Sequence, residues 1–159
     1  DSELFNNSTD DVEAAIFWKA MGGTPDTAVT LNDVGALASH GGTAIVLRGV
    51  DTTTPLDVTP TTVGWYDVPA ITPTTAGAWI FTSLHLGSEP ADSSVITTKP
   101  TNMTLVGQGT STDGSTYQID FAAAYKDDWV SGEFDGAAWT RTSAAGNGHV
   151  GITFAVRPA

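Results

Sequence analysis

The clearest structural signal in the chain is TYQIDFAAAYK at residues 116–126, joined by HVGITFAVR at residues 149–157. In both stretches apolar side chains recur at every second position. Because successive side chains of a strand point to opposite faces, this period of two predicts two β-strands, each with one face on a core. We expect these two apolar rows to face one core: Tyr117, Ile119 and Phe121, continuing through Ala123 and Tyr125, and Val150, Ile152, Phe154 and Val156.

Apolar runs elsewhere indicate further strands. Residues 43–50, TAIVLRGV, are almost continuously apolar, which predicts a central strand covered on both faces. Residues 78–86 carry another alternating row, which runs from Ala78 to Leu86. Shorter strands are expected at residues 12–18, 27–31, 63–71 and 102–108, whereas residues 127–148 are expected to be irregular.

Turn-forming residues separate these runs, and no segment has a strong helical pattern. Many short strands punctuated by Gly, Pro, Asp and Ser favour an antiparallel β-sandwich, jelly-roll-like in arrangement. A chain of 159 residues suits one domain. We therefore predict a polar leader at residues 1–11, DSELFNNSTDD, and a single sandwich domain at residues 12–159.

Charge and composition exclude several classes of function. The chain has 18 acidic and 6 basic residues, a net charge of −12, so it repels nucleic-acid backbones and anionic membrane surfaces. Such acidity suits solubility in a salty or extracellular medium. Cysteine is absent, which excludes cysteine-based zinc sites, thiol catalysis and iron–sulfur clusters. No apolar run approaches the ~20 residues that a membrane-spanning helix needs.

No catalytic constellation stands out. His40, Gly41 and Gly42 are similar to the oxyanion loop of esterases, but that chemistry also needs a G-x-S-x-G nucleophile elbow, which the sequence lacks. Glycoside hydrolysis needs two carboxylates that flank the scissile bond, and the acids here have no recognisable setting. We therefore predict that the chain is not an enzyme and needs no cofactor.

The acids within residues 127–135, DDWVSGEFD, are the best candidates for binding a metal. Carboxylate oxygens are the ligands that Ca²⁺ prefers, although this spacing does not match an EF-hand loop. Solvated surface acids are the simpler interpretation. The candidate ligands for a structural calcium ion are Asp127, Asp128, Glu133 and Asp135.

Aromatic residues in turn-rich segments are the candidates for binding a partner or a glycan. They are Trp65, Tyr66, Trp129 and Trp139. An aromatic ring on a loop can stack on a sugar, anchor a partner protein, or cap the end of a sandwich core. The sequence leaves these three roles open.

Residues 44–55, AIVLRGVDTTTP, resemble a poorly annotated β-sandwich family found in tailed-phage structural proteins and in bacterial surface or secreted proteins. The family pattern runs from an apolar strand into R-G-V-D-x-x-x-P. It continues through a second apolar strand and a P-x-x-M segment, and it ends in a strand that closes with R-P. The matching pieces here are residues 44–55, 78–86, 100–103 and 152–158.

The chain also departs from that pattern. The family usually has an earlier strand and a Leu-Pro-x-Gly-Trp turn before the region equivalent to residues 1–20, and both are missing here. We therefore expect a fragment, or a domain that is open at one edge and completed by another chain. Within the shared motif, Arg48 interrupts an apolar run and is expected to need a buried partner. Asp51 is expected either to pair with Arg48 or to cap the following turn.

The resemblance implies no enzyme activity and no cofactor. It favours a non-enzymatic module of a phage virion, a head decoration or tail-associated adhesion protein, that contacts other virion or surface subunits in an oligomer or larger assembly. The expected location is the virion surface or the extracellular medium. The alternative is a carbohydrate-binding module of a secreted or cell-surface protein, which would need two or more exposed, coplanar loop aromatics beside polar groups.

Overall fold

The computed structural model describes residues 2–9, 12–24, 26–30, 39–64, 66–88, 96–112, 118–142 and 148–159, with backbone alone at residues 2–9 and Ser88. Its regular elements are all β-strands, and the sheets are antiparallel and pack against one another. The predicted antiparallel β-sandwich is therefore confirmed.

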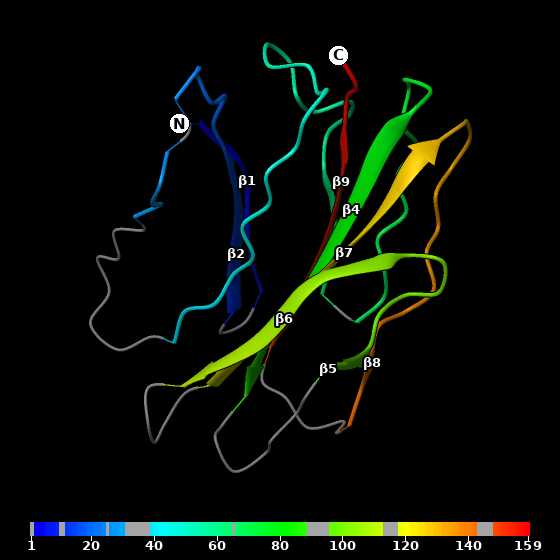
Figure 1. The fold of residues 1–159 in the computed structure, drawn as a ribbon. Coiled ribbons are helices and arrows are strands. Elements are labelled where there is room, and N and C mark those ends of the chain that lie inside the picture. The colour runs from blue at the N-terminus through cyan, green and yellow to red at the C-terminus, as the bar shows by residue number, and fades with distance from the viewer. Residues whose placement is uncertain are drawn as a thin grey trace.

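A five-stranded sheet forms the centre of the molecule (Figure 1). Its strands, in spatial order, are β3 (Thr61–Val63), β9 (His149–Val156), β4 (Ala78–Ser88), β7 (Gln118–Trp129) and β6 (Thr104–Thr112). Two smaller sheets accompany it: β1 (Ser2–Thr9) with β2 (Val12–Trp18), and β5 (Ile96–Thr98) with β8 (Thr140–Arg141).

The central strand β4 is covered on both faces. On one face Ile80, Leu84 and Leu86 are fully buried. They pack with alanines of β7 and with side chains from the loops and the β5–β8 sheet. The remaining members of this larger core are Val68, Ile71, Ile96, Met103, Ala122, Ala124, Phe134, Trp139 and Ala155.

The β1–β2 hairpin covers part of the opposite face of the sheet (Figure 1, in blue). Val12 and Ala14 of β2 are buried against Val150 and Ile152 of β9. The alternation in residues 12–18 is thus that of a strand, as expected, because its inward row is buried and its outward row is exposed.

The two alternating runs share one face, as predicted. In the register of the sheet, Phe81 of β4 lies beside Phe154 of β9, and His85 of β4 lies beside Phe121 of β7. Residues that pair in this way point to the same face. The odd positions of β4 and β7 and the even positions of β9 therefore face the hairpin. Tyr117 lies outside the described residues. The interleaved row of β7 is buried too, because it faces the larger core, so a polar or small residue in this alternation does not mark a solvent face.

Residues 43–50 are not the central strand. Residues 41–47 form no strand, and Ile45 and Val46 are 39% and 69% exposed. The centre of the sheet belongs to β4, which pairs with β7 on one side and β9 on the other. A continuous apolar run forms a central strand only if other strands pair with it on both sides. Here β7 and β9 pair with β4 and not with residues 43–50.

Other segment boundaries also differ from the expectation. Residues 1–11 contain β1, whose backbone pairs with β2, so polar side chains there do not prevent strand formation. No strand forms at residues 26–30, and the edge strand expected at 63–71 is Thr61–Val63. Strand β6 runs to Thr112, and β7 extends to Trp129 into the stretch expected to be irregular.

Candidate functional site

The RGVD segment lies antiparallel to the C-terminal end of the chain. The amide of Asp51 donates to the carbonyl of Arg157 at 3.0 Å, and the amide of Arg157 donates to the carbonyl of Pro55 at 2.9 Å. The amide of Ala159 donates to the carbonyl of Gly49 at 2.9 Å. Two sequence motifs that are about a hundred residues apart therefore form one structural unit.

Asp51 caps the turn that follows it, which is one of its two predicted roles. Its carboxylate accepts from the amide of Thr53 at 2.7 Å and from the amide and hydroxyl of Thr54, both at 3.0 Å. These bonds, led by the Thr54 amide, lower the pKa of Asp51. Arg48 is exposed, so the expectation of a buried arginine is wrong.

An ion pair in this region joins the buried Asp57 to the partly exposed Arg157, with an Nε–Oδ1 distance of 3.3 Å. The carboxylate of Asp57 is fully buried and also accepts hydrogen bonds from Thr74 and Thr75. Burial alone would raise the pKa of Asp57, but the Thr75 and Thr74 hydrogen bonds and Arg157 outweigh it and lower the pKa. The sequence alone did not indicate a role for Asp57, because its partners Thr74, Thr75 and Arg157 are distant along the chain. These contacts tie residues 57 and 74–75 to Arg157, directly after the last strand of the chain.

Trp139 is part of the larger core. It is 2% exposed, and its amide donates to the carbonyl of Tyr66 at 2.8 Å. Its indole Nε1 is buried and has no hydrogen-bond acceptor among the described residues. Of the three roles left open for loop aromatics, Trp139 therefore takes the core-capping one, and it is not a surface anchor.

The other described loop aromatics are half-buried and engaged within the chain. Trp129 packs edge-on against Phe134 with a centroid distance of 5.5 Å, and its Nε1 donates to the carbonyl of Gly132 at 3.1 Å. The guanidinium of Arg141 covers the ring of Tyr66 at 4.9 Å. Trp65 lies outside the described residues. The described rings thus do not make the flat exposed platform that glycan stacking needs.

The four candidate calcium ligands are all exposed. Asp128 has a positive φ of 56° at the end of β7. Across the described parts of the chain, no three His, Asp or Glu side chains converge as metal ligands would. Asp127, Asp128, Glu133 and Asp135 are therefore not brought together as a calcium site.

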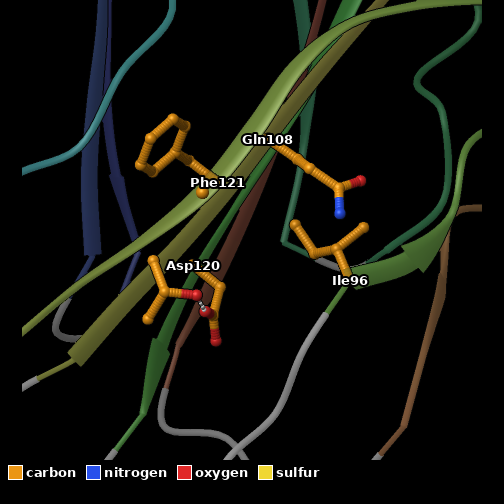
Figure 2. A pocket seen from close by; sticks show the side chains of 6 residues that line it. Ile96, Gln108, Asp120 and Phe121 are labelled. Carbon is orange, nitrogen blue, oxygen red and sulfur yellow. Dashed lines mark hydrogen bonds between the residues drawn. The ribbon is translucent and has the colours of Figure 1, made fainter.

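A small cavity of about 80 Å³ opens beside β6 and β7 (Figure 2). It is lined in part by Gln108, Ile96 and the buried Asp120. The Asp120 carboxylate accepts hydrogen bonds from the hydroxyl of Thr110 and, at 3.1 Å, from the side-chain Nε2 of Gln118. The volume suits a few water molecules rather than a substrate.

Among the described residues, His85 is a titratable group with a strongly shifted pKa. It lies on β4, level with Val150 and Phe121, and its Nε2 is 3.3 Å from the Ser83 hydroxyl. Burial lowers the pKa of His85 to about 4. Burial favours the neutral form of this histidine, and its contact with Ser83 joins two residues of the same strand.

Exposed apolar side chains concentrate in the N-terminal part of the chain. Five of the seven large ones in the described residues are Phe17, Met21, Val29, Ile45 and Val46; the other two are Leu105 and Val130. Phe17 is 59% exposed and Val29 is 76% exposed. Large apolar side chains left exposed to water are candidates for a protein contact.

Comparison of the chain with models of known families, with curated proteins and with solved structures finds no match. Among the described residues, no helix is long and apolar enough to cross a membrane.

Proposed function

We propose that the chain is a non-enzymatic structural module of a phage virion, either a head decoration protein or a tail-associated adhesion protein. It is displayed on the virion surface or in the extracellular medium. Its partners are other virion or surface protein subunits, and neither nucleic acid nor a membrane is among them. The RGVD resemblance in residues 44–55 supports this class of protein.

The observation that carries the proposal is the exposed apolar set in residues 17–46. Phe17, Val29 and Val46 are each more than half exposed, although all three are side chains that proteins usually bury. They belong to the hairpin and to the segment that follows it, outside the five-stranded sheet. A subunit contact that covers these side chains removes apolar area from water and stabilises the assembly.

The charge of the chain agrees with an outward position. A net charge of −12 opposes packing against DNA inside a capsid and favours solubility on an outer surface. The glycan-binding alternative draws less support, because Trp139 is buried and Trp129 is packed edge-on against Phe134.

Particle fractionation tests the proposal. Antibodies raised against the chain should detect it in density-gradient fractions of purified virions from the source culture, and gold-labelled antibody should decorate the particle surface. The double substitution Phe17→Ser and Val46→Ser should weaken incorporation, because it removes exposed apolar area without touching a buried residue. As a matched control, Thr97→Ala and Thr140→Ala should leave incorporation unchanged, since both threonines are exposed on the β5–β8 sheet.

A screen against glycan, ester and peptide substrates tests the non-enzymatic part. We expect no turnover. Hydrolysis that disappears on Glu133→Gln, or on replacement of the Asp127–Asp128 pair by Asn, would overturn the structural role, as would absence of the chain from purified particles.

A further inference from the structure

Strand β6 forms one edge of the central sheet. It pairs with β7 on one side, and no other strand among the residues that the structure describes pairs with its opposite edge. In an antiparallel ladder about half of the backbone N–H and C=O groups of such a strand point outward. The opposite edge, β3, has three residues and directly follows Pro60, so β6 offers much the longer row of open backbone groups.

β6 carries none of the charges that usually protect an edge strand. Its sequence, TLVGQGTST, contains no Lys, Arg, Asp, Glu or Pro. Natural edge strands are commonly blocked by charged residues or proline, which prevent another strand from adding to the sheet. One protective feature is present, a bulge between Leu105 and Gly107, and beyond it the strand pairs regularly from Gly107 to Thr112.

The absence of charge matters because the chain as a whole is strongly acidic. Two copies with a net charge of −12 each repel one another wherever carboxylates face carboxylates. No residue of β6 carries a carboxylate. Two β6 strands can therefore pair without bringing like charges of their own side chains together. The strand is therefore suited to a second copy of this chain.

We propose that β6 pairs antiparallel with β6 of a second copy, about a two-fold axis at Gly109. Antiparallel pairing of identical strands in one continuous sheet places the axis perpendicular to the sheet, so that residues of the same face lie opposite one another. An axis at Gly109 pairs the regular residues 107–111 beyond the bulge. The two five-stranded sheets then form one sheet of ten strands.

This pairing deepens the proposed function, since it names a second copy as a partner within the assembly. In this register the side chain of Gln108 lies opposite Thr110 of the partner subunit and diagonal to Gln108 of the partner subunit. Gln108 is exposed and extends from β6 on the same side as Ile96 (Figure 2). Long side chains at diagonal positions, about 7–8 Å apart, are within reach of each other.

Gln108 therefore provides a charge-complementation test. The unmodified chain should form a dimer at high concentration in sedimentation equilibrium. The dimer should tighten as salt is raised, because screening reduces repulsion between the acidic surfaces. Gln108→Lys and Gln108→Glu should each weaken the homodimer several-fold, at most about fivefold for one like-charge pair. An equimolar mixture of the two variants should recover the dimer, and native mass spectrometry should show it as the mixed species.

Ser131→Lys is the matched control, because Ser131 is exposed and lies in the loop after β7, outside β6. It should dimerise as the unmodified chain does. A chain that stays monomeric at every concentration and salt, charge variants that dimerise as well as the unmodified chain, or a mixture that does not recover the dimer would each overturn the pairing. Loss of particle association with dimerisation intact would instead remove the virion role and leave the pairing of β6 standing.

Discussion

At the scale of single residues, this fold depends on side chains whose neighbours are distant in sequence. Phe81 is 2% exposed, and its ring stacks on those of Tyr125 and Phe154 at centroid distances of 5.9 and 5.1 Å. These residues come from three adjacent strands of the sheet. The aromatic row therefore ties β4, β7 and β9 together on the face that the hairpin partly covers.

Phe81→Ala should lower the free energy of unfolding by about 3–5 kcal/mol, the usual cost of truncating a buried aromatic residue. Chemical denaturation followed by fluorescence measures this change. Phe17→Ala is the control, since Phe17 is 59% exposed and should change the stability by less than about 0.5 kcal/mol. Equal losses from the two substitutions would contradict the assignment of Phe81 to the core.

The Asp57–Arg157 pair gives a second prediction at this scale. Arg157→Met keeps much of the side-chain volume but removes the charge, which leaves Asp57 with the threonine hydrogen bonds alone. We expect a loss of about 1.5–3 kcal/mol, typical of hydrogen bonds to charged groups. A double-mutant cycle with Asp57→Asn should show coupling between the two sites. Additive effects would mean that the pair contributes no interaction energy.

At the scale of elements, the packing of β6 and β7 against the segment before residue 50 requires glycine. A Cβ atom at Gly109 would lie 2.7 Å from the ring of Phe121, and one at Gly41 would overlap the same ring. The segment after Ser39 therefore approaches β7 closely at Phe121. Glycine at position 41 therefore allows this close packing on Phe121.

Gly109→Ala should destabilise the protein by about 1–3 kcal/mol, because the added methyl group must displace the Phe121 ring. Gly42→Ala is the matched control, since nothing lies within 4 Å of a Cβ there. Thermal unfolding of both variants provides the comparison. The close approach would be disproved if Gly109→Ala melted at the same temperature as Gly42→Ala.

At the scale of the whole molecule, the free energy of unfolding depends on pH through groups whose pKa values change on folding. The pKa of His85 is about 4 in the folded protein and 6.5 in its ordinary state, so between these values the unfolded chain binds the proton more readily. Stability should therefore fall as pH drops from 6.5 towards 4. Below pH 3.8 the lowered pKa values of Asp51 and Asp57 add to the loss, because both carboxylates are stabilised in their charged form.

His85→Gln should flatten the change in unfolding midpoint between pH 6.5 and 4, because the variant removes the group that the unfolded chain protonates. Denaturant titrations at several pH values measure it. His40→Gln, at an exposed position, is the control and should retain the slope of the unmodified chain. An unchanged slope in the His85 variant would assign the pH dependence to other groups.

Local pattern by itself determined the all-β class, the strands at residues 12–18 and 78–86, and the shared face of the two terminal runs. It could do so because a period of two is a property of neighbouring residues. The cap formed by Asp51 was also foreseeable, since its partners are two and three residues away.

Only the tertiary structure decided what covers each face and which strand is central. The run at residues 43–50 has the composition of a buried strand, yet β4 occupies the centre, because burial depends on which strands become neighbours. For the same reason Trp139, one of the candidate loop aromatics, is a core residue, and Asp57 has its cationic partner a hundred residues away at Arg157. Pairing and packing join segments that are distant along the chain, and the local sequence does not specify which distant segments become neighbours.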